Sequence, residues 1–185
     1  RTLEGLAWKD YNRNGVQDEE QADQMNGVRV ELLKLSEGGD PQRKEDYVPV
    51  CYPNADGTPG TNPVQVMTGQ QISIRDTDGS NAIAYTPDGD TGRYKFLDLP
   101  AGTYAVRFSS GEGSISDLKA TGKDLWGNDE IDSDAEPSYE NDTLQSTIIL
   151  GIVMKDAESI YGEEQDTAEP KLIQESKFHD SGFYP

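Results

Sequence analysis

The alternation of apolar and polar side chains over residues 93–108 constrains the fold of this chain more than any other feature. Apolar or aromatic residues recur at every second position on both sides of a Pro-Ala-Gly turn: Tyr94, Phe96, Tyr104, Val106 and Phe108. Successive side chains of a β-strand point to opposite faces of its sheet, so this period of two indicates half-buried strands. We expect two strands here, paired as a hairpin, with the aromatic side chains in the core.

Further strand candidates are short and are separated by turn signals rich in Gly, Pro, Asp and Asn. They cover residues 4–9, 28–32, 47–51, 64–67, 71–75, 82–86, 147–153 and 178–184. No stretch of ten or more residues has convincing helical periodicity, and only 153–163 could hold a turn or two of helix. This organisation predicts an all-β antiparallel sandwich. We expect one domain over residues 1–185, with insertions at about 36–69 and 153–175.

The charge of the chain is one-sided, with 35 acidic residues against 16 basic ones and a net charge of −19. A nucleic-acid-binding protein needs a basic surface, so this class is disfavoured, as is adsorption to an anionic membrane. No apolar run is long enough to cross a bilayer. The one cysteine, Cys51, leaves no internal disulfide to stabilise the fold. No signal peptide is visible, and we expect the chain to be a module of a longer protein.

Residues 10–21 have the ligand pattern of a calcium loop. Ca²⁺ takes 6–8 oxygen ligands, and a loop that supplies them from alternate residues needs a sharp central turn. Gly15 permits that turn. The oxygen donors would be the side chains of Asp10, Asn12, Asn14 and Asp18, the carbonyl of Val16, and Glu20 or Gln21 at the end of the loop.

This loop departs from an EF-hand in two respects. An EF-hand has a bidentate Glu at loop position 12, whereas this chain has Gln21 there and Glu20 one residue earlier. The flanking segments alternate like strands, whereas EF-hand flanks are helical. We therefore interpret the segment as an EF-hand-like calcium loop between two strands. The alternative is a solvated turn without metal, because Asn, Asp and Gly favour turns in any case.

Three segments together resemble a known family. Trp8-Lys9-Asp10 runs into the loop, a central segment reads Gly92-Arg93-Tyr94-Lys95-Phe96-Leu97-Asp98-Leu99-Pro100-Ala101-Gly102-Thr103-Tyr104, and Asp132-Ser133-Asp134 precedes a final Asp180-Ser181-Gly182-Phe183-Tyr184. In this order they resemble the B repeats of serine–aspartate-repeat surface adhesins of Gram-positive bacteria, within the Cna B-type, prealbumin-like family. The resemblance implies a sandwich of about seven strands, stabilised by Ca²⁺, in cell-wall-anchored extracellular stalks. It also implies a second calcium site that includes Asp132, Asp134 and Asp180, for which the alternative is a solvated acidic loop.

Enzymatic chemistry is not expected. The sequence has a single histidine, His179, and no nucleophile motif, phosphate loop or zinc spacing. Many Cna B-type relatives form a Lys–Asn or Lys–Asp isopeptide bond with the help of a buried Glu, for which Lys9 and Asp180 are conceivable partners. The matching position of that Glu is Phe108, which cannot transfer protons. We therefore predict no isopeptide bond, and an intact mass about 17 or 18 Da below the sequence mass, the ammonia or water lost with the bond, would contradict this.

Two functions remain open. The first is a calcium-binding structural stalk module that contacts neighbouring domains of the same surface protein. The second is a ligand-binding adhesin module, in which the 36–69 insertion contacts a host protein or a glycan, because loops on a rigid β scaffold often carry binding sites. Insertions are also tolerated at low free-energy cost without any function. The sequence alone does not separate these two functions.

Overall fold

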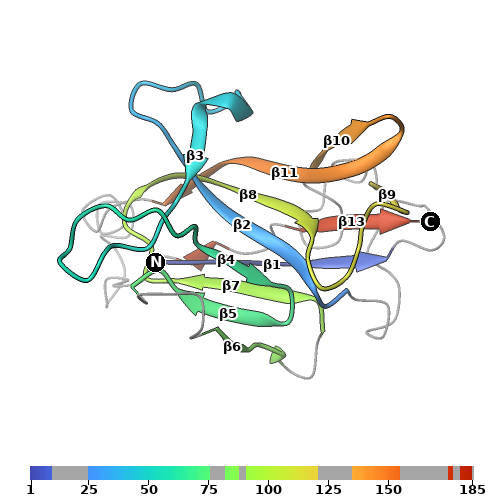
Figure 1. Ribbon diagram of the computed structural model, residues 1–185, viewed down its shortest axis with the longest axis horizontal. Helices are drawn as coiled ribbons and strands as arrows, with labels where there is room; N and C mark the ends of the chain where they lie inside the picture. The colour runs from blue at the N-terminus through green and yellow to red at the C-terminus, as the bar shows by residue number, and fades with distance from the viewer. Residues whose placement is uncertain are drawn as a thin grey trace, which may run out of the picture.

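Two β-sheets face each other across an apolar core, and the strands of each sheet come from distant parts of the chain (Figure 1). The computed structural model describes residues 1–9, 25–75, 82–87, 91–120, 135–154, 175–176 and 180–184. Regular structure in these ranges is β-strand, apart from one 3₁₀ turn at Lys44–Asp46. No helix in the described ranges has the length and apolar character needed to span a membrane. The predicted all-β sandwich is confirmed.

The first sheet has seven strands in the order β6-β5-β7-β1-β13-β9, with β12 also paired to β1. Their bounds are β1 (Thr2–Lys9), β5 (Gln70–Ser73), β6 (Ile83–Ala84), β7 (Arg93–Leu97), β9 (Lys119–Ala120), β12 (Glu175–Ser176) and β13 (Ser181–Tyr184). Three of its strand pairs are parallel, β1 with β12, β1 with β13, and β5 with β7. The other three, β1 with β7, β13 with β9, and β5 with β6, are antiparallel.

The second sheet has six strands in the order β10-β11-β8-β2-β3, with β4 also paired to β2. Their bounds are β2 (Val28–Leu35), β3 (Tyr47–Pro49), β4 (Gln65–Met67), β8 (Gly102–Ser110), β10 (Glu136–Glu140) and β11 (Thr143–Met154). Several strands of both sheets have only two or three residues, which is why the described strands exceed the predicted number of about seven.

The predicted hairpin over residues 93–108 is wrong, although both of its strands exist. β7 belongs to the first sheet and β8 to the second, so the turn at residues 98–101 connects the two sheets. Tyr94 and Phe108 meet from opposite sheets, with ring centroids 5.5 Å apart and planes at 82°. The period of two correctly predicted which side chains are buried. It contains no information on which strand is the hydrogen-bonded neighbour.

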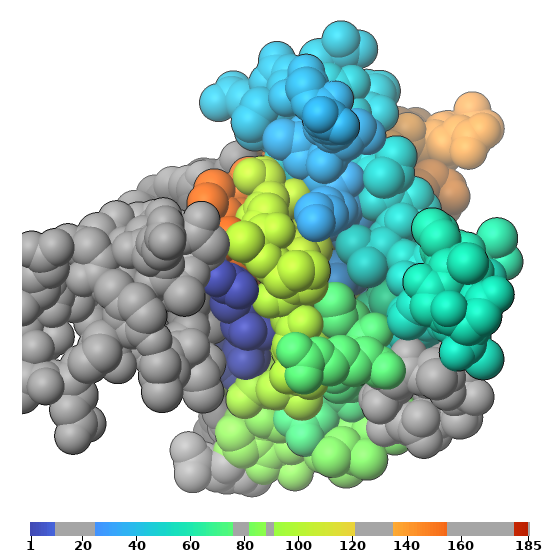
Figure 2. All heavy atoms as spheres, turned by 90° about the vertical axis from the view of Figure 1, so that its left-hand side faces the viewer, coloured from blue at the N-terminus to red at the C-terminus, as the bar shows by residue number. Residues whose placement is uncertain are grey.

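Part of the segment expected as an insertion at 36–69 is built into the second sheet. β3 pairs with the end of β2 and β4 with its beginning, so both strands lie along one edge. The rest of the segment forms two projections, visible at the top and at the right of Figure 2, from residues 36–46 and 52–62 respectively. The insertion predicted at 153–175 lies almost entirely outside the described residues, so its boundaries stay a prediction.

Candidate functional site

The predicted calcium loop lies outside the described residues, but the structure describes the chain on both sides of it. β1 ends at Lys9, and the chain is described again from Met25. The Met25 backbone N–H donates to the Ala7 carbonyl at 2.8 Å. The two described residues that flank this segment, Lys9 and Met25, therefore both lie at the end of β1. The predicted ligands Asp10, Asn12, Asn14, Val16, Asp18, Glu20 and Gln21 fall between them, outside the described residues, and stay a prediction.

Thr68 fixes the return of this segment to the sandwich. Its hydroxyl donates to the Met25 carbonyl at 2.5 Å and accepts from the Val28 N–H at 3.0 Å. Asn26 adds a second attachment, because its Oδ1 accepts a hydrogen bond from the Gly92 N–H at 2.5 Å. The sequence predicted a turn at Asn26-Gly27 but assigned neither Asn26 nor Thr68 to the site, since neither belongs to a ligand motif. Only the fold brings them to the base of the loop.

Asp180 is fully buried, in contrast to the exposed position usual for an aspartate. Its Oδ1 accepts a hydrogen bond from the Leu6 backbone N–H at 2.9 Å. A carboxylate oxygen has more than one lone pair, so this bond is compatible with a metal ligand role. The other predicted members of the second site, Asp132 and Asp134, lie outside the described residues. Their proximity to Asp180 stays a prediction.

A second polar contact beside Asp180 joins the two sheets. The hydroxyls of Ser181 on β13 and Thr147 on β11 lie 2.7 Å apart, and both side chains are fully buried. Buried polar groups cost free energy unless they are hydrogen-bonded, so these pairs favour one position of β13 over others. The last strand is thus attached to β1 through its backbone and Asp180, and to the opposite sheet through Ser181.

Within the described residues, no group of three or more His, Cys, Asp or Glu side chains is placed to hold a metal ion. Phe108, at the position where isopeptide-forming relatives have a Glu, is fully buried in the aromatic core. Lys9 lies half-buried at the end of β1. The absence of an isopeptide bond stays a prediction for the mass measurement.

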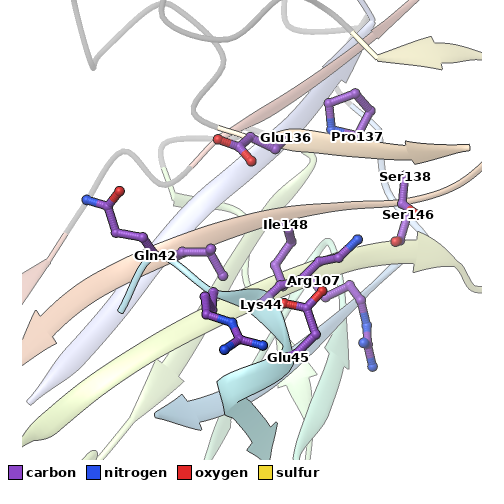
Figure 3. Close-up of a pocket in the computed structure, with 11 residues that line it drawn as sticks. Gln42, Lys44, Glu45, Arg107, Glu136, Pro137, Ser138, Ser146 and Ile148 are labelled. Atoms are coloured by element: carbon purple, nitrogen blue, oxygen red, sulfur yellow. The ribbon is translucent and has the colours of Figure 1, made fainter. Parts of the chain in front are cut away.

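A shallow groove lies on the outer face of the second sheet, between the 3₁₀ turn and β10 (Figure 3). Its volume is about 520 Å³. Gln42, Lys44 and Glu45 lie on one side, Glu136 and Pro137 lie on the other, and Ile148 lies between them. No sequence pattern indicated a groove at this position.

The chain matches the model of a known protein family. The model of the SdrD B-like domain matches residues 51–158, more than half of the chain. No curated protein matches the chain. SdrD B-like domains occur in bacterial cell-surface proteins as structural, non-catalytic repeats, and calcium binding is known among them. The match agrees with the sandwich fold and with the resemblance drawn from the sequence, and we conclude that this chain belongs to the SdrD B-like domain family of bacterial surface proteins.

Proposed function

We propose that this domain is a calcium-stabilised stalk module that transmits tension between neighbouring parts of a surface protein. The observation that carries the proposal is the parallel pairing of β1 with β13, with Ala7 opposite Ser181 and Lys9 opposite Phe183. The N-terminus lies in the left part of the molecule and the C-terminus at its right-hand side, so the two are separated along the long axis (Figure 1). Tension between them would therefore pull two neighbouring strands past each other, so that several backbone hydrogen bonds resist at once.

Calcium would act next to the end of β1, where Lys9 pairs with Phe183 of β13. The 10–24 segment begins at the end of β1, and its base is closed by the Met25–Ala7 hydrogen bond. An ion bound by Asp10, Asn12, Asn14 and Asp18 would hold the end of β1 against the beginning of β2. Because the ion binds the folded domain and not the unfolded chain, it adds free energy of unfolding, about 2.7 kcal/mol at one hundred times Kd.

Thermal unfolding in chelator and in millimolar Ca²⁺ tests the calcium part of the proposal. We expect a higher melting temperature in Ca²⁺ for the unmodified chain and a smaller shift for Asp10→Ala. Asp56→Ala is the matched control, because Asp56 lies in the 52–62 projection and its carboxylate accepts hydrogen bonds from the backbone N–H and the hydroxyl of Thr58. This control should keep the full calcium shift. Equal melting temperatures of the unmodified chain in Ca²⁺ and in chelator would refute the proposal.

The second predicted site can be tested through its coupling to the first. If Asp132, Asp134 and Asp180 bind calcium in the same network as the 10–21 loop, Asp10→Ala and Asp132→Ala remove parts of one structure. Their effects on the free energy of unfolding at fixed Ca²⁺ should then be non-additive in the double variant. Strictly additive losses would mean that the two sites act independently.

A ligand-binding role of the 36–69 segment is the second candidate, and the groove beside the 3₁₀ turn is the observation that favours it. Membership of the domain family does not indicate which host protein or glycan would bind. Deleting residues 40–68 is a poor test, because it removes β3 and β4, which complete the edge of the second sheet. Point substitutions at the groove leave that edge intact.

A further inference from the structure

The groove is built on a regular strand surface. Its floor includes Ser146, Ile148 and Leu150, which are alternate residues of β11 and therefore point to the same face of the sheet. Arg107 of the neighbouring β8 lies beside them. Side chains on such a floor repeat every two residues, at an interval of about 6.6 Å. An extended peptide laid along β11 repeats its own side chains at the same interval.

One wall of the groove is fixed by Tyr47 rather than being a free loop. The Tyr47 hydroxyl donates to the Pro41 carbonyl at 2.8 Å and accepts from the Gly151 N–H at 3.0 Å. Its ring packs with Leu33, Ala105 and Ile148 in a small apolar cluster on the outer face of the sheet. The turn that carries Arg43, Lys44 and Glu45 is thus attached to β11. Ordering a mobile loop on binding costs free energy. Because this wall is already fixed, binding in the groove does not include that cost.

The charges at the groove are mixed, with Arg43, Lys44 and Arg107 against Glu45 and Glu136. Arg107 is already engaged, because it forms an ion pair with Glu31 at 2.6 Å. Arg43 and Lys44 have no side-chain ion-pair partner among the residues that the structure describes. The chain has 35 acidic residues for 16 basic ones, so two adjacent cations without an ion pair to any described residue stand out. They place two positive charges on the wall of the groove that also carries Glu45.

We propose that this groove binds an extended peptide segment in which carboxylate side chains alternate with apolar ones. The carboxylates would contact Arg43 and Lys44, and the apolar side chains would pack on the partly exposed Leu150 and on the edge of Ile148, which is 8% exposed. Glu45 and Glu136 repel a peptide with a carboxylate at every position, which favours the alternating sequence over a purely acidic one. This binding is independent of calcium and of the stalk function, so either proposal can fail without the other.

The probe for this proposal is an acetylated and amidated hexapeptide of alternating glutamate and valine, with a glutamine–valine peptide as its neutral counterpart. Binding is measured by NMR titration of the isotope-labelled domain at fixed Ca²⁺ and low salt. We expect the acidic peptide to shift backbone signals of residues 42–45 and 146–150 and to bind at least about tenfold more tightly than the neutral one.

Variants that change the charge of the groove then locate the site. Lys44→Glu should weaken binding about tenfold, because it replaces an attraction by a repulsion. Glu45→Gln should strengthen binding, because it removes a negative charge that repels the peptide. Arg75→Glu is the matched control: it makes the same charge change next to β5 of the other sheet, on an exposed side chain. It should leave the affinity unchanged. The proposal is wrong if the acidic peptide does not bind, if its signals map elsewhere, or if Arg75→Glu weakens binding as much as Lys44→Glu.

Discussion

Asp180 shows how one buried carboxylate contributes to this fold at the scale of a single residue. Its Oδ1 satisfies the Leu6 N–H, a backbone donor in the strand that borders β13. The sequence interval of 174 residues explains why sequence analysis could not predict this bond. An Asp before Ser-Gly is more typical of an exposed turn, and only the parallel β1–β13 register brings it against β1.

In chelator, where no calcium contributes, Asp180→Ala should lower the free energy of unfolding by about 1–3 kcal/mol, because it leaves a buried N–H without an acceptor. Asp180→Asn keeps an oxygen at the same position and should cost less. Urea unfolding of the two variants and the unmodified chain measures both effects. Equal losses for Ala and Asn would show that the hydrogen bond to Leu6 is not the source of the stabilisation.

Ionisation of the Tyr104 phenol should lower the stability of the domain at alkaline pH. Burial raises the pKa of its phenol to about 12, against an opposing effect of the Arg1 charge, and its hydroxyl donates to the Pro100 carbonyl. A raised pKa in the folded state means that the stabilisation is complete below the unfolded pKa, near 10, and is lost as the pH rises toward 12. Tyr104→Phe should therefore show a smaller loss of stability between pH 10 and 12. An identical pH profile for the variant would contradict this.

At the scale of the element, a β-bulge in β11 and the projection formed by residues 36–46 depend on each other. The register of β11 against β8 shifts between Ile149 and Ile152, and Gly151 adopts a φ of 72° that favours glycine. Its N–H is bonded to the Tyr47 hydroxyl instead of a β8 carbonyl. The bulge leaves the Gly151 N–H free of β8, and its hydrogen bond to the Tyr47 hydroxyl attaches the projection to the sheet.

Tyr47→Phe removes both hydrogen bonds of this hydroxyl while the ring still fills the apolar cluster. We expect faster amide hydrogen exchange at Arg43 and Asp46, whose N–H groups bond to carbonyls within the same projection. The opening free energy of the projection should fall by about 1–2 kcal/mol. Tyr139→Phe is the control, because that hydroxyl accepts a bond from Ala120 elsewhere. Unchanged exchange at Arg43 and Asp46 would contradict the anchoring role.

The elements also show where sequence reasoning reached its limit. The period of two predicted the buried faces of β7 and β8, and every aromatic residue of that pattern is in the core. The predicted hairpin failed because an alternating strand fits either sheet of a sandwich equally well. Asp98 has a φ of 65° at the start of the connecting turn, and the chain then enters the other sheet. Strand neighbours depend on long-range packing, which a local pattern does not record.

At the scale of the whole molecule, the last strand, β13, and the residues that flank the predicted ion loop all lie against β1. β1 has β7 on one side and β12 and β13 on the other, so it is the central strand of the first sheet. Residues 10–24 return to it through Met25. The sequence correctly predicted the sandwich and both terminal strands. It could not predict that these two strands are parallel neighbours, since that depends on the closure of the whole sheet.

Single-molecule pulling on the two chain ends tests the proposed stalk function most directly. Tethers at residues 1 and 184 load the β1–β13 pair in shear, whereas tethers at residues 1 and 141 attach to the β10–β11 turn in the other sheet and serve as the control. We predict a higher unfolding force for the first geometry, and a fall of that force when Ca²⁺ is replaced by chelator. Equal forces in the two geometries, or the same force with and without Ca²⁺, would contradict a calcium-stabilised load-bearing module.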